Sequence, residues 1–532
     1  MISQKRKKIL KERIENSWGK LKTDNFNFSL IESYFAKKDH AENLQTINKR
    51  IIDDIDLYDI FMFIDRTNSK IGQLFYFDNL LSLNFNREKI LEREKFINYL
   101  IQNKEERTNI QLLLSNLNSN DAYYIPDLFL ADILSKPKYF SIIKSLSIVS
   151  LLLFILSFFY DFLFFLLIPM LIANMATHYW NKRNIYMYMY SIPQLISLIE
   201  CSNMLIKLKA PFVADRNKVL KAIKSINDLK KQMFVFKMEL NLTSSELYSI
   251  IQLIVEYVKI LFVLEPLIVF NVLSKLKNRK TEIQTLFTFI GEIDTCISIA
   301  NLRSGASYYC IPDISKENSS IEFADIYHPL IENCVANSLS ISNEKSILLT
   351  GSNMSGKTTF IRTVALNSLL GQTINTCFAH RFSMYPLKIF TGINMADSLS
   401  ENKSYYLQEV QLLKTMIDAS SQTKYANFYF LDELFRGTNT RERISAGAAV
   451  LSYLTKGNNV VLVSTHDIEL TELLASEYEL YHFTEVINDN NICFDYKIKG
   501  GKLDTFNAIR ILEINHYPKE ISQTAKSIYL KL

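Results

Sequence analysis

The sequence predicts an α plus α/β protein: a core of long helices that carries a transmembrane helical hairpin, followed by a C-terminal α/β domain. Nine of the thirteen glycines lie at or after Gly351, so the preceding residues are poor in an amino acid that interrupts helices. The run Ser145–Asn181 is apolar and contains one formal charge, Asp161. A strand-like run, a glycine-rich loop and a helix-like run follow one another from Ile347 to Leu366. A chain of 532 residues has room for roughly two to four domains.

The glycine-rich loop fits the pattern G-x-x-x-x-G-K-[ST] at every defined position. It comprises Gly351, Ser352, Asn353, Met354, Ser355, Gly356, Lys357 and Thr358, with Thr359 directly after it. Between a strand and a helix, the backbone N–H groups of such a loop converge on nucleotide phosphates. We expect Lys357 to reach the β- and γ-phosphates and the Thr358 hydroxyl to bind Mg²⁺. The sequence therefore predicts a binding site for a nucleoside triphosphate and magnesium.

Two carboxylates, Asp432 and Glu433, follow the apolar, strand-like run Phe428–Leu431. An α/β sheet binds its ligand at the carboxyl ends of its strands. We expect Asp432 to hold Mg²⁺ with its water shell, and Glu433 to orient or deprotonate the attacking water. Another strand-like run, Asn459–Ser464, leads to His466. We expect the His466 imidazole to sense the γ-phosphate; a solvent-exposed histidine at a strand end is the alternative.

Three blocks of this sequence resemble the ATPase domain of the MutS family: Gly351–Thr359, Asp432–Thr440 and Ser464–His466. The second block, D-E-x-x-R-G-T-x-T, is far more specific than a phosphate-binding loop. Further agreement lies at residues 65–72, 291–300, 308–312, 327–331, 397–404 and 518–521. The resemblance extends from about Asp53 to the C-terminus. It implies an ABC-type P-loop ATPase domain that binds ATP and Mg²⁺, after a helical core.

The resemblance also implies a homodimer, because the family's nucleotide is sandwiched between two subunits. Ser404 precedes the helix-like run that begins at Tyr405. We expect its hydroxyl and backbone N–H to reach the γ-phosphate of the partner's site, in trans. ATP then closes the dimer, and the helical core transmits that closure as a lever. In DNA-binding relatives these levers end in a clamp around the duplex, so DNA is an expected partner.

The chain departs from the family pattern in three places. Mismatch-reading members carry two more domains before the helical core, the first with a Phe-x-Glu motif. Here the sole Phe-x-Glu is Phe483–Glu485, within the ATPase region. We therefore expect no mismatch reader, and DNA recognised by its structure, such as branched DNA. Ser352 replaces a usual proline, a harmless change because that position contributes backbone, and Cys334 stands where an aromatic ring often stacks on adenine.

The apolar run is long enough for two membrane-spanning helices, since each needs about 20 apolar residues. Asp161 divides it into the segments Tyr139–Phe159 and Phe162–Trp180. Basic residues flank both ends: Lys136, Lys138, Lys144, Lys182 and Arg183. By the positive-inside rule, both termini of a multi-pass cell-membrane protein then lie in the cytoplasm, with the lipid bilayer as a partner. A hairpin buried in a soluble core, or packed on another protein, is the alternative.

These patterns divide the chain into five segments. They are a basic N-terminal helical segment at 1–50, the first part of the helical core at 51–138, the transmembrane hairpin at 139–181, the second part of the core at 182–315 and the ATPase domain at 316–532. The net charge of +5 is too small to indicate nucleic-acid binding by itself. The six cysteines form no C-x-x-C pair, which indicates neither a disulfide framework nor a zinc site.

Two functions fit the sequence. The first is a membrane-anchored MutS-family ATPase whose ATP-dependent dimer closure drives DNA binding, in mismatch repair or recombination. The second is a membrane-associated ATPase whose ATP-dependent dimer closure acts on a protein or lipid partner, without DNA. Basic residues after the hairpin favour the first: Lys207, Lys209, Lys218, Lys221, Lys224, Lys230 and Lys231. Lysine-rich helices are, however, commonly solvated faces with no ligand.

Overall fold

The computed structural model describes residues 4–240, 246–342, 344–352, 354–394, 405–421, 425–488, 491–503, 512, 514 and 516–529. Internal contacts separate the chain into two units. Unit 1 comprises Met1–Asp39, Ile64–Asp78 and Arg87–Gly305, and unit 2 comprises His40–Phe63, Asn79–Asn86 and Ala306–Leu532. The predicted order, a helical region followed by a mixed α/β P-loop domain, is confirmed. The five predicted segment boundaries stay predictions.

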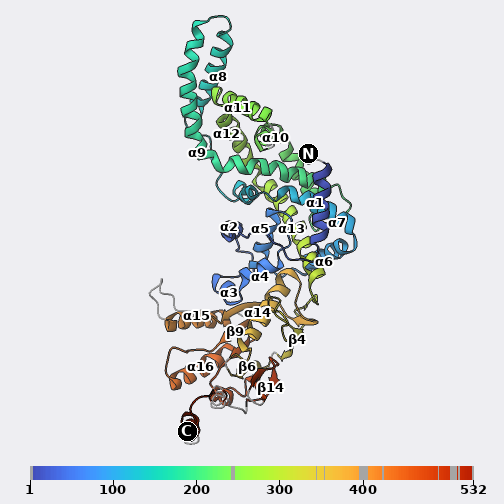
Figure 1. The fold of residues 1–532 in the computed structure, drawn as a ribbon, viewed down its shortest axis with the longest axis vertical. Helices are drawn as coiled ribbons and strands as arrows, with labels where there is room; N and C mark the ends of the chain where they lie inside the picture. Colours follow the sequence, from blue (N-terminus) through green and yellow to red (C-terminus); the bar gives the residue numbers. More distant parts are fainter. Residues whose placement is uncertain are drawn as a thin grey trace. The chain divides into compact units, whose positions relative to one another are not determined.

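Unit 2 contains a six-stranded sheet with the order β14-β11-β6-β10-β9-β8 (Figure 1). Its strands are β6 (Ser346–Gly351), β8 (Leu387–Gly392), β9 (Ala426–Asp432), β10 (Val460–Ser464), β11 (Tyr478–Phe483) and β14 (Lys499–Gly500). The first five of these pair in parallel, whereas β14 is antiparallel to β11. Parallel strands with helices on both faces read as continuous apolar runs, as β6, β9 and β10 do. The carboxyl ends of β6, β9 and β10 therefore lie side by side at one edge of the sheet.

The helices of unit 2 that pack on this sheet include α14 (Lys357–Ile374), α15 (Tyr405–Ser420) and α16 (Thr440–Leu454). Tyr429 and Leu431 of β9 belong to one buried cluster with side chains of α15 and α16. Their neighbours Phe428 and Phe430 point to the opposite face and are fully buried as well. Apolar side chains on both faces thus fix β9 in the middle of the layered domain, with Asp432 at its end.

A second, four-stranded sheet of unit 2 has the order β3-β7-β4-β5. Its strands are β3 (Asp313–Ile314), β4 (Ser320–Ile326), β5 (Asn337–Ser342) and β7 (Arg381–Met384). The remaining described elements of this unit include α17 (Glu469–Leu473), the β12 (Glu485–Asn488) and β13 (Asn491–Phe494) hairpin, and α19 (Lys519–Tyr529). The β4–β5 connection supplies residues 331–335 to the cavity described below.

Unit 2 also contains a stretch from early in the chain, with β1 (Gln45–Thr46), β2 (Ser82–Leu83), α3 (Lys49–Asp54) and α4 (Leu57–Ile64). The Gln45 side chain donates to Ile389 O at 2.6 Å and accepts from Ile389 N at 2.8 Å. The Asp54 carboxylate accepts from the N–H groups of Ile393 and Asn394. Residues 40–63 therefore belong to the α/β unit, although the sequence division placed them in the N-terminal segment and the helical core.

Unit 1 is helical. Its helices are α1 (Gln4–Ser17), α2 (Phe28–Lys37), α5 (Lys70–Leu81), α6 (Arg87–Gln102), α7 (Lys104–Leu114), α8 (Phe140–Leu156), α9 (Phe162–Leu205), α10 (Arg216–Leu240), α11 (Glu246–Leu261), α12 (Leu264–Leu276) and α13 (Lys280–Gly305). Helix α1 packs on α7, where the Arg107 guanidinium lies 3.6 Å from the centre of the Trp18 ring. The apolar side of the basic N-terminal helix therefore packs within unit 1.

The buried carboxylate of Asp294 links the two segments of the helical core that resemble the MutS family, residues 65–72 and 291–300. Asp294 of α13 accepts hydrogen bonds from the backbone N–H groups of Asn68 and Ser69 and from the Ser69 hydroxyl. A Cβ at Gly72 would lie 2.2 Å from Asp294 Oδ2, so only glycine allows this close approach. Burial raises the pKa of Asp294, and these hydrogen bonds oppose that rise. The motifs at 65–72 and 291–300 thus hold the core helices in register.

The predicted hairpin region forms two antiparallel helices, α8 and the first part of α9, which project together from the rest of unit 1 (Figure 1). Helix α9 differs from the prediction because it does not end at Trp180 but continues through Pro193 to Leu205. The segment Phe162–Asn181 is long and apolar enough to cross a membrane and is only 11% buried. A second such stretch, Leu264–Gly305, is 83% buried, as expected of core helices.

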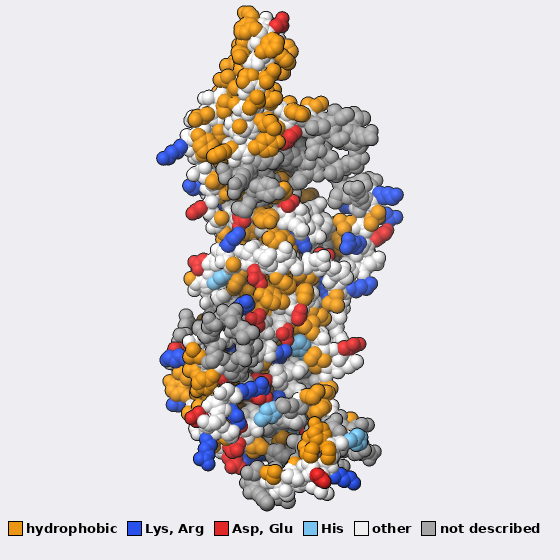
Figure 2. Space-filling view, turned by 60° about the vertical axis from the view of Figure 1, so that its left-hand side comes forward, with side chains coloured by type: hydrophobic (Ala, Val, Ile, Leu, Met, Phe, Trp, Pro, Cys, Tyr) orange, Lys and Arg blue, Asp and Glu red, His pale blue; other side chains and the backbone are white. Residues whose placement is uncertain are grey.

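Hydrophobic side chains crowd the surface of this hairpin (Figure 2). Four large ones are more than two-thirds exposed: Phe158, Phe159, Phe165 and Trp180. The side chains that the hairpin buries include four polar ones: Ser150, Asn174, His178 and Asn181. The hairpin therefore has apolar groups outside and polar groups inside, the reverse of the pattern usual for a surface helix.

Candidate active site

The phosphate-binding loop connects β6 to α14, as predicted. Gly351 has φ +150°, and a Cβ there would lie 2.6 Å from Phe483 O. Gly356, directly before the first residue of α14, has φ +101°. Both conformations strain any residue with a side chain, so the two glycines of the motif are required by the loop's backbone. Asn353 of this loop lies outside the described residues.

Lys357 is buried at the first turn of α14 and points back across the loop. Its Nζ donates to Gly351 O at 2.8 Å and to Ser352 O at 2.9 Å. Burial lowers the pKa of Lys357, while the nearby Glu433 and Asp432 carboxylates oppose that shift. The ammonium is thus held at the mouth of the loop, where an anionic phosphate would replace the two carbonyl contacts.

Thr358 and Asp432, the two predicted magnesium ligands, lie in direct contact. The Thr358 hydroxyl donates to Asp432 Oδ2 at 2.7 Å, and the Ser464 hydroxyl donates to Asp432 Oδ1. Adjacent oxygens around Mg²⁺ at about 2.0–2.1 Å from the metal are about 2.9 Å apart. The separation of the two ligand oxygens therefore fits neighbouring positions of an octahedral Mg²⁺ site, completed by water and phosphate oxygens.

Glu433 follows directly after β9 in a left-handed backbone conformation, with φ +49°. Its N–H donates to Ser464 O at 2.9 Å, and its Oε1 lies 2.9 Å from His466 Nε2. Its other oxygen pairs with the Arg436 guanidinium. Burial alone would raise the pKa of Glu433, but the hydrogen bonds and charges of His466 and Arg436 outweigh it and lower the pKa to about 2. Glu433 is therefore ionised at neutral pH.

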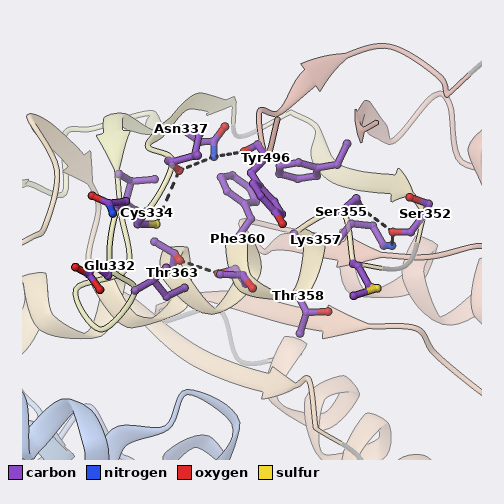
Figure 3. A pocket seen from close by; sticks show the side chains of 18 of the residues that line it. Glu332, Cys334, Asn337, Ser352, Ser355, Lys357, Thr358, Phe360, Thr363 and Tyr496 are labelled. Carbon is purple, nitrogen blue, oxygen red and sulfur yellow. Dashed lines mark hydrogen bonds between the residues drawn. The ribbon is translucent and has the colours of Figure 1, made fainter. Parts of the chain in front are cut away.

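A cavity of about 610 Å³ opens beside this loop (Figure 3). Cys334 and Asn337 lie toward one end of it, and Ser355 and Lys357 toward the other. Glu433 and Arg436 belong to the same lining. The phosphate loop and Glu433, the carboxylate predicted to activate water, thus face one space, large enough for a nucleotide.

Tyr496 is a lining residue that the sequence analysis missed. Its ring lies over the loop, with Cδ1 3.1 Å from the position of a Cβ at Gly356, and its carbonyl accepts from Asn337 Nδ2 at 3.0 Å. The tyrosine therefore offers an aromatic face to the cavity beside the phosphate loop, away from Cys334 (Figure 3). No motif signals it, because it follows the β12–β13 hairpin far along the chain from the phosphate loop.

Two carboxylates outside the predicted set hold the site's loops. Glu409 of α15, fully buried, accepts from Phe435 N at 2.6 Å and so fixes the loop after Glu433. Glu485 accepts from the Ser352 hydroxyl at 2.5 Å, a contact that a proline at this position would lack. The Ser352 side chain therefore makes a contact of its own, and the expected contribution of its backbone to the loop stays a prediction. Ser404, predicted to act in trans, lies outside the described residues.

A known protein family matches the C-terminal α/β part of the chain. Residues 347–532 match the family model of MutS domain V. The C-terminal part of this chain is thus similar to the ATPase domain of the MutS family. Because MutS domain V is an ABC-type ATPase, the predicted enzyme class is confirmed, and ATP binding follows from it. The side-chain roles predicted within the site stay predictions.

Similarity to curated relatives extends beyond this domain over about half of the chain. The DNA mismatch repair protein MutS of Clostridium kluyveri is 28% identical over 272 residues, which are 48% of this chain and 31% of the relative. The protein of the same name from Listeria welshimeri is 31% identical over 285 residues, which are 51% and 32%. That of Thermotoga petrophila is 28% identical over 267 residues, which are 48% and 33%. The chain thus matches about a third of the length of each relative.

Proposed function

We propose that this chain is a membrane-anchored, Mg²⁺-dependent ATP hydrolase that works as a homodimer and couples ATP binding to a grip on DNA. The observation that carries the enzymatic part is the contact between Thr358 and Asp432, with Glu433 beside them. These residues come from α14 and from the end of β9, and the fold brings them to one edge of the sheet. The membrane, dimer and DNA parts rest on the separate arguments that follow.

Each residue of the site has a distinct task in hydrolysis. Lys357 binds the β- and γ-phosphates, and the loop N–H groups surround them. Thr358 and Asp432 hold Mg²⁺, which when bound neutralises charge on the transferring phosphoryl group. Glu433, ionised and fixed by two partners, accepts a hydrogen bond from the attacking water and takes its proton. His466 holds the Glu433 carboxylate in place and lies close enough to respond to the γ-phosphate.

The dimer is proposed from the family resemblance, in which the position of Ser404, directly before Tyr405 in the sequence, reaches the partner's nucleotide. Ser404 of one protomer completes the partner's site by donating to the γ-phosphate. Binding of ATP at both sites then joins the two ATPase domains, and hydrolysis separates them. MutS-family proteins generally form dimers and bind DNA, which supports this reading.

The membrane anchor is proposed from the inverted surface of the α8–α9 hairpin. Phe158, Phe159 and Phe165 are exposed, whereas Asn174 and His178 are buried. In hydrocarbon, apolar side chains face the lipid and polar ones face the protein. A soluble protein gains nothing from exposing such a surface, which marks an interaction site. By the positive-inside rule, the lysines before α8 and the basic residues in α9 after Trp180 support a topology with both chain termini on the cytoplasmic side.

DNA is proposed as the substrate because the curated relatives are named DNA mismatch repair proteins and because basic side chains line part of unit 1. Lys218, Lys221 and Lys224 of α10 are exposed, at a spacing of three residues. Such a row would neutralise phosphates without reading bases. The ligand proposed is structured DNA, such as a branched duplex. A lipid or protein partner is the second candidate, favoured by the exposed apolar hairpin.

The test is the rate of ATP hydrolysis by the full chain in liposomes, with and without DNA. We expect stimulation by branched DNA above that by linear duplex, single strands or liposomes alone. Lys221→Glu with Lys224→Glu should weaken DNA binding. It should also make the dependence of the binding constant on salt concentration less steep, by the equivalent of about two phosphate contacts. The control, Lys277→Glu with Lys316→Glu, changes two exposed lysines elsewhere and should leave both unchanged. If none of these DNA molecules changes the rate of ATP hydrolysis, DNA is rejected as the partner in favour of a lipid or protein.

A further inference from the structure

We propose that His178, Glu256 and Glu265 form a binding site for a divalent transition-metal ion, Zn²⁺ or Mn²⁺, at the base of the α8–α9 hairpin. The three residues come from α9, α11 and α12 of unit 1. One nitrogen or oxygen of each lies within 4.8 Å of those of the other two. This proposal is independent of the ATPase site and of the choice of substrate.

The distances between these atoms suit coordination better than hydrogen bonding. His178 Nε2 lies 3.6 Å from Glu265 Oε2 and 4.0 Å from Glu256 Oε1. Hydrogen bonds of this kind are about 2.7–3.2 Å long. Two ligand atoms bound tetrahedrally to Zn²⁺ at about 2.0–2.2 Å are about 3.3–3.6 Å apart. The three atoms therefore surround a point where an ion would reach all of them after small side-chain rotations.

The buried carboxylate of Glu265 provides the second, independent observation. Its side chain is only 3% exposed, and its Oε1 has no hydrogen-bond partner within the described part of the chain. A carboxylate taken out of water costs free energy unless a cation or donors compensate it. Its Oε2 faces His178, which is itself buried. A metal ion at this point would compensate the charge of the buried Glu265 carboxylate.

The neighbouring groups are arranged as outer partners of such a site. The Lys259 ammonium lies 3.8 Å from Glu256 Oε2, the oxygen that does not face His178. With a neutral imidazole, two carboxylates and one ammonium leave one negative charge, which a divalent ion outweighs. Asn174, one helical turn before His178, donates to the Ser150 hydroxyl and to Leu261 O, both at 2.6 Å. These bonds hold α8, α9 and the α11–α12 turn together around the site.

The ligand set points to particular metals. Imidazole nitrogen suits Zn²⁺ and other transition metals, and carboxylate oxygen suits Mn²⁺ and Zn²⁺. Three protein ligands leave a further position for water, as in zinc sites that are not purely structural. Because the ligands come from three helices, the ion would fasten the hairpin to α11 and α12. Metal loading would then set how firmly the hairpin is held.

The experiment measures metal bound to the full chain in detergent after EDTA treatment and dialysis. We expect one equivalent of Zn²⁺ by elemental analysis, competition by Mn²⁺, and a higher melting temperature of the ATP-loaded protein with metal. Co²⁺ in place of Zn²⁺ should give visible absorption bands of a four- or five-coordinate site. Glu265→Gln and His178→Gln should weaken binding by more than about 100-fold, since loss of outer partners alone costs about 10–100-fold.

The control is Glu200→Gln, which removes a carboxylate of α9 that pairs with Lys230 outside the cluster. The Glu200→Gln protein should bind one equivalent of Zn²⁺, as the unchanged chain does. Retained ATP hydrolysis shows that the Glu265→Gln protein is folded, and Glu256→Gln, with its more exposed carboxylate, provides a gentler second variant. The proposal is overturned if the unchanged chain binds neither Zn²⁺ nor Mn²⁺. It is overturned equally if the folded cluster variants bind the metal as tightly as the control does.

Discussion

His466 Nε2 lies 2.9 Å from Glu433 Oε1. His466 stands two residues after strand β10, and it holds the carboxylate of the residue directly after the neighbouring strand β9. The pairing of β9 with β10 brings the two together, since Ser464 stands opposite Asp432 in the register. Arg436 holds the other Glu433 oxygen. The carboxylate therefore has a fixed direction before any water or phosphate arrives, which is what activation of a water molecule requires.

Removing the Glu433 carboxylate should separate binding from turnover. Glu433→Gln should bind ATP as the unchanged chain does and lower kcat about 10²–10⁴-fold, the usual contribution of a positioned base. Lys357→Ala should instead abolish ATP binding, because the ammonium contacts the phosphates. Titration with a fluorescent ATP analogue and steady-state ATP hydrolysis distinguish the two variants. Equal ATP affinity of Lys357→Ala and the unchanged chain would falsify the assignment of the loop.

The lowered pKa of Glu433 predicts a pH-dependent contribution to stability. The pKa falls from an ordinary value of 4.5 to about 2 in the folded chain. The paired carboxylate therefore stabilises the fold fully above pH 4.5, and this contribution is lost as pH falls from 4.5 to 2. The difference in melting temperature between the unchanged chain and Glu433→Gln should shrink over that interval. A difference that stays constant from pH 6 to pH 3 contradicts the pairing.

Mixed dimers test the action of Ser404 in trans. Lys357→Ala cannot bind ATP, and Ser404→Ala cannot complete the partner's site, so each variant alone should be inactive. An equal mixture should recover about a quarter of the normal activity, since half of randomly paired dimers are mixed and each has one complete site. Tagged subunits purified in tandem confirm that mixed dimers are present. Mixed dimers without activity would indicate that each protomer hydrolyses ATP by itself.

The close approach of Gly72 to Asp294 predicts a stability effect in unit 1. Gly72→Ala places a Cβ 2.2 Å from Asp294 Oδ2 and should destabilise the fold by about 1–3 kcal/mol, as overpacking does. Gly500→Ala is the control, because the nearest atom to its Cβ is 4.0 Å away. Thermal unfolding of both variants checks the prediction. An unchanged melting temperature for Gly72→Ala would mean that the helices separate easily at this point.

Local patterns predicted the site's main parts because the chemistry of each depends on neighbours in sequence. The loop from Gly351 to Thr358 and the acids at the end of β9 could be placed from strand, turn and helix signals alone. Tyr496, by contrast, reaches the cavity through the tertiary fold, and so does Glu409, which holds the loop after Glu433. The extension of α9 to Leu205 was missed because Pro193 and mixed polarity suggest interruption, whereas packing keeps the helix continuous.

Flotation of the full chain with liposomes, followed by measurement of Mg²⁺-dependent ATP hydrolysis in the floating fraction, tests the central claim most directly. We predict that the unchanged chain floats with the lipid and hydrolyses ATP there. Leu152→Arg with Leu166→Arg should leave the floating fraction, since each arginine at a helix centre costs about 2.5–3.5 kcal/mol of insertion. Both leucines are exposed, so a soluble protein would tolerate the change, and Leu91→Arg in α6 is the matched control. An unchanged chain that stays soluble without detergent, and hydrolyses ATP in the lipid-free fraction, would contradict the account.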